Sequence, residues 1–116
     1  MPVSLAAITF DCTDVTKQST FWSALLGQPV DEGANNFFAS IGYGGPGPGY
    51  LFLFVGERAE GKNQVHIDLT DPDYPAEVER AVGLGAQKVA DFNEYGVTWT
   101  TLRDPEGNLF DIAHMH

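Results

Sequence analysis

The stretches DVTKQSTFWSALLG at residues 14–27 and DYPAEVERAVGLG at residues 73–85 decide the fold. Each begins with an aspartate, which suits the N-cap of a helix, and ends with a glycine, which suits the turn after a helix. Phe21 and Leu25 lie four positions apart in the first stretch. Because residues at this spacing share one face of a helix, the pattern predicts a helix with an inward-facing apolar stripe.

The second stretch repeats the first at a fixed distance along the chain. Val78 and Val82 form its apolar pair, and its closing glycine, Gly85, lies 85 − 27 = 58 positions after Gly27. That spacing is half of the 116-residue chain. The sequence therefore predicts an internal repeat with one helix in each half.

Strand-like runs surround both predicted helices in the same order. The predicted strands are 6–14, 29–31, 36–41 and 50–55 around the helix at 15–26, and 64–71, 88–92, 97–102 and 109–113 around the helix at 74–84. This order predicts an α+β fold of two βαβββ modules. Neither half, of about 58 residues, could bury a sizeable core alone. We therefore expect one domain over 1–116, with modules at about 1–57 and 58–116.

The composition is that of an acidic globular chain. Its 6 basic and 16 acidic residues give a net charge of −10, which argues against nucleic acid and anionic membranes as partners and leaves a cationic ligand open. No apolar run approaches the roughly 20 residues of a membrane span, and the N-terminal residues do not read as a secretory signal. The single cysteine, Cys12, cannot form an intrachain disulfide, and we expect it in the core of a cytoplasmic protein.

Three motifs, taken with the repeat, carry a resemblance to a known superfamily. They are Asp14 with Phe21-Trp22 and Leu26-Gly27, then Val65-His66-Ile67-Asp68, and then Asp104-Pro105-Glu106-Gly107-Asn108. Together they resemble the vicinal oxygen chelate superfamily of glyoxalase I, extradiol dioxygenases and bleomycin-resistance proteins, and most closely its small glyoxalase-like members. The resemblance implies a U-shaped, mostly antiparallel sheet around a cleft, helices on the outer face, and a homodimer. Whether modules pair within one chain or between chains stays open.

The resemblance also implies four metal-ligand positions, two in each module. In the second module they fall on His66 and Asp111, which are ligand types for a divalent ion. In the first module they fall on Leu53 and on Ala7 or Thr9, depending on the register, and none of these is a usual ligand. We therefore expect no cofactor and no metal, with His66 and Asp111 as residual ligand-type positions. A weak divalent-metal site remains the alternative.

The expected cleft combines apolar and polar side chains, which is the usual make-up of a small-molecule site. The residues expected to line it are Thr9, Asp11, Phe38, Leu53, His66, Asp68, Trp99, Thr101 and Asp111. His66 and Asp111 are the candidate catalytic pair, because a histidine beside a carboxylate can orient a ligand or transfer protons. The alternative is a buried His66 hydrogen-bonded to Asp111 or Asp68. Trp99 either lines the cleft or packs under a helix.

The incomplete ligand set favours one function over two others. We expect a glyoxalase/bleomycin-resistance-like protein that binds a small organic molecule in a metal-independent cleft. The alternative is a lyase, isomerase or dioxygenase that uses His66 and Asp111, with or without a metal, so whether the chain is an enzyme stays open. A protein that retains the fold only for interaction or structure is the third hypothesis, and no sequence feature supports it.

Overall fold

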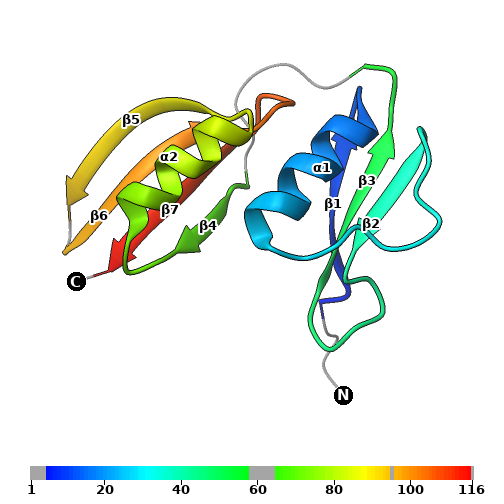
Figure 1. The fold of residues 1–116 in the computed structure, drawn as a ribbon, viewed down its shortest axis with the longest axis horizontal. Coiled ribbons are helices and arrows are strands. Elements are labelled where there is room, and N and C mark those ends of the chain that lie inside the picture. Colours follow the sequence, from blue (N-terminus) through cyan, green and yellow to red (C-terminus); the bar gives the residue numbers. More distant parts are fainter. Residues whose placement is uncertain (1–4, 58–64, 95, 116) are drawn as a thin grey trace. The chain divides into compact units, whose positions relative to one another are not determined.

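The structure, a computed structural model, describes residues 5–57, 65–94 and 96–115. In chain order the elements are β1 (Ala7–Cys12), α1 (Val15–Leu26), β2 (Phe38–Ile41), β3 (Gly49–Phe54), β4 (Ile67–Thr70), α2 (Tyr74–Leu84), β5 (Gln87–Glu94), β6 (Val97–Arg103) and β7 (Leu109–Met115) (Figure 1). The chain divides into two compact units, Met1–Ala59 and Glu60–His116, each with one helix and one sheet. Neither helix has the length and apolar character that crossing a membrane requires.

The first unit is a three-stranded sheet with α1 on one face. β3 lies in the middle, parallel to β1 and antiparallel to β2. The core forms where Phe10 stacks on Trp22 of α1 at 5.5 Å and on Phe52 at 5.2 Å between ring centroids. Cys12 and Phe52 are fully buried and Trp22 is 1% exposed, so the predicted core position of Cys12 is confirmed.

The second unit is a four-stranded sheet in the order β4-β7-β6-β5. β4 runs parallel to β7, whereas the other two pairs are antiparallel. Leu102 of β6 and Phe110 of β7 are buried on the face that α2 covers, and Val78 and Ala81 are the buried residues of that helix. Both sheets are thus mixed, and the predicted α+β class is confirmed.

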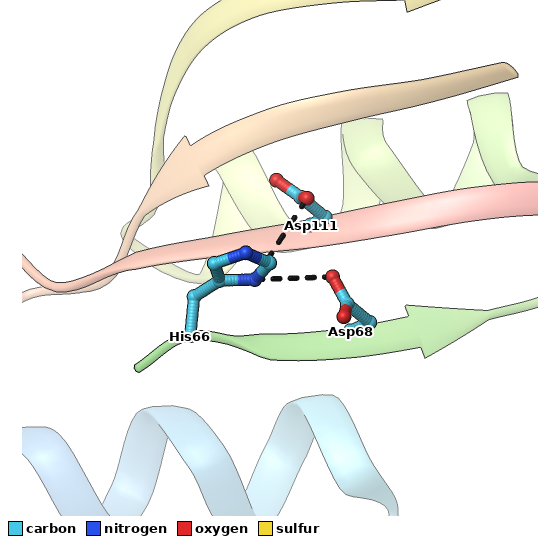
Figure 2. A group of neighbouring side chains, drawn as sticks. All are labelled: His66, Asp68 and Asp111. Atoms are coloured by element: carbon cyan, nitrogen blue, oxygen red, sulfur yellow. Dashed lines mark ion pairs between the residues drawn. The ribbon is translucent and has the colours of Figure 1, made fainter. Parts of the chain in front are cut away.

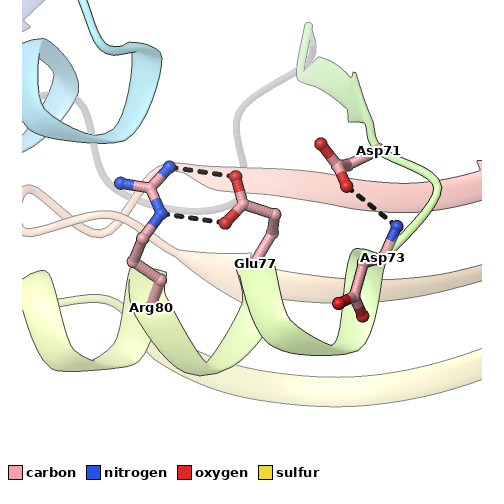
Figure 3. A network of polar contacts seen from close by, with 4 residues as sticks. All are labelled: Asp71, Asp73, Glu77 and Arg80. Atoms are coloured by element: carbon pink, nitrogen blue, oxygen red, sulfur yellow. Dashed lines mark hydrogen bonds and ion pairs between the residues drawn. The ribbon is translucent and has the colours of Figure 1, made fainter.

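The helix ends follow the predicted chemistry in α1 and a variant of it in α2. The Asp14 side chain accepts a hydrogen bond from Lys17 N, and Gly27 closes α1 with φ at 69°. At α2 the Asp73 side chain makes no capping bond; instead its backbone N donates to Asp71 Oδ1 at 2.8 Å (Figure 3). One turn further along, the hydrogen bond from Arg80 holds the pKa of Glu77 below its ordinary value.

The strand predicted at 29–31 does not form, so the described residues of the first unit contain three strands where four were expected. Pro29 has no N–H to donate to a strand ladder. Asp31 instead anchors a loop: its N donates to Ser40 O at 2.8 Å, and its carboxylate accepts bonds from Ser40 Oγ at 2.7 Å and Tyr43 N at 3.1 Å. These local bonds replace strand pairing.

Two further expectations need correction in the second unit. Val82 is 45% exposed although Val78 is buried, because the buried stripe of α2 runs from Val78 to Ala81. The strand predicted at 64–71 begins at Ile67, so His66 lies directly before β4. The motif at 104–108 forms the turn before β7, in which Gly107 N donates to Asp104 O at 2.8 Å.

Candidate functional site

One face of the second sheet carries polar side chains in register. β4 pairs Asp68 with Asp111 of β7, and β6 pairs Thr101 with the same Asp111. Because directly paired residues project to the same side of a sheet, these three side chains form a row across three strands. The buried Leu102 and Phe110 alternate to the side that α2 covers. The row therefore lies on the side turned away from α2, here called the open face of the second sheet.

His66 joins this row from the residue just before β4. Its Nδ1 lies 3.1 Å from Asp68 Oδ1 and 3.9 Å from Asp111 Oδ2, so the imidazole lies beside both carboxylates (Figure 2). Thr101 Oγ1 donates a hydrogen bond to Asp111 Oδ1 at 2.7 Å. Asp111 is thus contacted through both of its oxygens. We call His66, Asp68, Thr101 and Asp111 the polar row.

The polar row has a sheltered end and an exposed end. The exposed fraction of the side chain is 18% for Asp111, 42% for His66 and 66% for Asp68. Charges interact more strongly where water is partly excluded. The hydrogen bond from Thr101 therefore holds the Asp111 carboxylate in place, whereas solvent screens the charge of Asp68 most strongly.

An aromatic pair lies beside the polar row on the same face. Trp99 precedes Thr101 by two residues on β6 and therefore projects to the same side. β5 pairs Phe92 with Trp99, and the two rings stack with centroids 5.0 Å apart and planes at 18°. Phe92 is 38% exposed and Trp99 is half-buried. The register thus places Trp99 on the open face rather than under α2.

The comparison with protein families decides the identity of the fold. The family described as "Glyoxalase-like domain" matches residues 7–113 of this chain. The chain belongs to the glyoxalase-like family. This match confirms the resemblance to the vicinal oxygen chelate superfamily. Among curated proteins, none matches the chain.

Solved structures share the fold of this glyoxalase-like protein at low sequence identity. A glyoxalase/bleomycin resistance protein/dioxygenase family enzyme from Burkholderia phytofirmans is 18% identical, with a TM-score of 0.84 and coverage of 98% of this chain and 100% of that one. The fosfomycin resistance protein FosX from Listeria monocytogenes, complexed with Mn(II) and 1S,2S-dihydroxypropylphosphonic acid, is 16% identical, with a TM-score of 0.79 and coverage of 97% and 90%. Lactoylglutathione lyase from Agrobacterium tumefaciens is 14% identical, with a TM-score of 0.69 and coverage of 98% and 95%. These identities support the fold alone.

The first unit of the glyoxalase-like chain has a corresponding row with different chemistry. Leu53 of β3 pairs with Asp11 of β1 and with Phe38 of β2, on the side turned away from α1. The pairing of Asp11 with Leu53 corresponds to that of Asp68 with Asp111, which makes Thr9, rather than Ala7, the counterpart of His66. Leu53 is 37% exposed. This row offers hydrocarbon where the second unit offers a carboxylate.

The strand that carries Leu53 is less covered than expected. Phe52 and Phe54 alternate with Leu51 and Leu53 along 50–55, a pattern that predicts apolar cover on both sides of the strand, and Phe52 is fully buried. Phe54, however, is 46% exposed and meets the 69% exposed Phe37 edge to face at 6.0 Å between ring centroids. Helix α1 therefore does not cover the last residues of β3.

The four-ligand metal set that the family implies does not fit this glyoxalase-like chain, because Thr9 and Leu53 occupy two of its positions. The structure does place Asp68 beside the remaining pair. His66, Asp68 and Asp111 each offer a ligand atom, and these atoms lie within 4.8 Å of one another. Three such ligands could hold a divalent ion, but the 3.1 Å contact of His66 with Asp68 is also an ordinary hydrogen-bond distance.

The predicted site residues thus fall into two groups. The second unit brings together His66, Asp68, Trp99, Thr101 and Asp111, and the first unit brings together Asp11, Phe38 and Leu53, with Thr9 one position along β1. Phe92 was not predicted to lie on the open face. The sequence feature that indicates its position is the short connection around Gly96. Such a connection allows two neighbouring strands to pair as a hairpin, and this pairing brings Phe92 opposite Trp99.

Proposed function

We propose that this glyoxalase-like protein binds a small organic molecule on the open face of the second sheet, without a metal. The observation that carries the proposal is the polar row beside the stacked Trp99 and Phe92 on one side of one sheet. Small-molecule sites combine an apolar surface with a few positioned polar groups. Here the aromatic rings supply the first, and His66 with Asp111 supplies the second.

His66 is oriented for hydrogen bonding by the carboxylates beside it. When its Nδ1 carries the proton, it donates to Asp68 Oδ1 at 3.1 Å. The second ring nitrogen, Nε2, then keeps its lone pair and accepts a hydrogen bond or a proton from a ligand. A second carboxylate oxygen, Oδ2 of Asp111, lies 3.9 Å from Nδ1.

Trp99 and Phe92 give the ligand a flat apolar surface. Their stacked arrangement fixes both rings, so little side-chain entropy is lost when a second ring or an alkyl group packs on them. The partial exposure of both residues leaves area that a ligand would remove from water. The expectation from the sequence that Thr9, Asp11, Phe38 and Leu53 of the first unit line a cleft stays a prediction.

The test uses nuclear magnetic resonance on labelled protein in the presence of EDTA. The probes are benzyl alcohol, phenylacetate and benzyltrimethylammonium, which share a benzyl group and differ in charge. We expect at least one of them to shift the Trp99 indole and His66 ring signals and to leave the signal of Trp22, which is 1% exposed in the first unit, unchanged. If none of the three shifts the Trp99 and His66 signals, the proposed function is wrong.

Two variants distinguish binding at His66 from nonspecific binding elsewhere on the protein surface. His66→Ala is expected to weaken binding of the probe that shifts Trp99, because it removes the oriented imidazole. The matched control is His114→Ala, since His114 alternates to the other side of β7 from Asp111. Equal losses in the two variants would contradict the assignment of His66.

A metal-dependent or metal-free lyase, isomerase or dioxygenase activity that uses His66 and Asp111 is the second candidate. One observation favours the metal-dependent form: three ligand atoms of the polar row lie within 4.8 Å of one another. Micromolar binding of a divalent ion that is lost in His66→Ala would support this candidate, and it would contradict a metal-free site.

We also propose that residues 1–116 act as one domain, as a homodimer and in the cytoplasm. The first two proposals rest on the repeat and on the family, and the third on the single cysteine. Light scattering tests the dimer: a mass near 2 × 12.6 = 25.2 kDa is expected, and a mass near 12.6 kDa would contradict it.

A further inference from the structure

We propose that the molecule bound on the open face of the second sheet is an organic ammonium cation. The inference rests on the proposed function and names the chemical class of its ligand. It follows from the charge of the polar row, the position of the aromatic pair and the placement of the basic residues of the second unit.

The polar row is negative in either protonation state of its histidine. Asp68 and Asp111 contribute two negative charges when both are ionised, and with a protonated His66 the net charge is −2 + 1 = −1. Asp111 is the more effective of the two, because its side chain is only 18% exposed and Thr101 holds it in place. An anionic ligand would therefore meet repulsion here, and a cation would meet attraction.

The lysine and the two arginines described in the second unit contact groups outside the polar row. Lys88 Nζ lies 2.7 Å from Asp91 Oδ2, and Arg80 on α2 donates to Glu77 at 2.9 Å. Arg103 shares the open face by alternation with Thr101, but it lies at the end of β6, where Nη1 donates to Gly107 O at 3.1 Å. In the described part of the second unit, Arg103 is thus the one lysine or arginine on the open face, and it lies two residues from Thr101, on the opposite side of Thr101 from Trp99.

The aromatic pair adds a second attraction for the same class of ligand. A cation over the face of a tryptophan is attracted by the negative ring face, by about 0.5–1 kcal/mol at exposed sites and more where water is excluded. Trp99 and Thr101 are two residues apart on one strand, which separates neighbouring rows by about 6–7 Å. One ammonium group with a short organic substituent spans that separation, so it can contact Trp99 and approach Asp111 together.

The test ranks the three benzyl probes by affinity, again in EDTA and at low salt, with the Trp99 indole and His66 ring signals as readouts. We expect benzyltrimethylammonium to bind at least about fivefold more tightly than benzyl alcohol, and phenylacetate to bind most weakly. We further expect added salt to weaken binding of the cation and to leave benzyl alcohol unaffected.

Matched variants locate the effect. Asp111→Asn is expected to weaken binding of benzyltrimethylammonium about fivefold and to leave binding of benzyl alcohol nearly unchanged. Asp68→Asn is a second variant, because the Asp68 side chain is too exposed for the change to disturb folding. Glu79→Gln removes the same charge from an exposed position on α2 and should change neither affinity.

The possible results separate the inference from the proposed function. If benzyl alcohol or phenylacetate shifts the same signals with equal or higher affinity than the cation, the cation inference is wrong and the proposed function stands. If no probe shifts them, both are wrong. Equal weakening by Asp111→Asn and Glu79→Gln would show that the cation responds to net charge alone and would overturn the inference.

Discussion

Replacing Thr101 by valine is expected to destabilise the second unit through Asp111. The substitution keeps the β-branched shape and the strand preference of the side chain and replaces by a methyl group the hydroxyl that donates to Asp111 Oδ1 at 2.7 Å. A hydrogen bond to a charged group contributes about 1.5–3 kcal/mol to stability. Because the Asp111 side chain is 18% exposed, water replaces part of the lost bond, and we expect a loss of about 1–2 kcal/mol.

The assay is urea denaturation followed by the Trp99 indole signal, which reports on the unit that contains the change. The matched control is Thr98→Val on the same strand, whose hydroxyl makes a longer bond of 3.4 Å to Asn93 Oδ1 between exposed groups. We expect that control to change stability by less than about 0.5 kcal/mol. If the two variants have the same midpoint and slope, Thr101 does not hold Asp111, and the reasoning about the polar row is wrong.

Two further predictions concern the first unit. The hydrogen bond from Ser40 lowers the pKa of Asp31 below its ordinary value of 3.8, so the stability it contributes is present above that value and is lost as the pH falls through the lower folded-state pKa. Asp31→Asn should therefore flatten the dependence of stability on pH between about pH 5 and pH 2, as measured by urea denaturation. Gly49→Ala should lower stability by about 1–3 kcal/mol in the same assay, because its Cβ would lie 2.8 Å from Tyr43 Cα, whereas Gly47→Ala meets nothing within 4 Å and should be neutral. Equal effects of the two glycine substitutions would show that the close approach to Tyr43 is not what requires a glycine.

The helices were predictable because their signals are local. In α1, the aspartate cap, the closing glycine and the Phe21/Leu25 pair all act within one helix, and the structure confirms each of them. The same reasoning failed for Val82, because the part of α2 that is buried depends on how the helix lies on its sheet. Helical periodicity identifies candidate faces, and packing selects among them.

The candidate site was predictable only in part, for a similar reason. Strand alternation placed Asp68 and His66 on one side, and the structure brings them within 3.1 Å. The hydrogen bond from Thr101 to Asp111 depends on the register between β6 and β7, which residues within one strand do not determine. The position of Phe92 opposite Trp99 depends on pairing between strands in the same way.

A calorimetric titration of metal-stripped protein with Mn²⁺, Ni²⁺, Zn²⁺ and, under anaerobic conditions, Fe²⁺ tests whether the polar row works without a metal. The matched control is His66→Ala, which removes one of the three ligand atoms that lie within 4.8 Å of one another. Because Thr9 and Leu53 occupy two of the four ligand positions, we predict no binding tighter than about millimolar for any of these ions. Micromolar or tighter binding that disappears in His66→Ala would contradict the metal-free site.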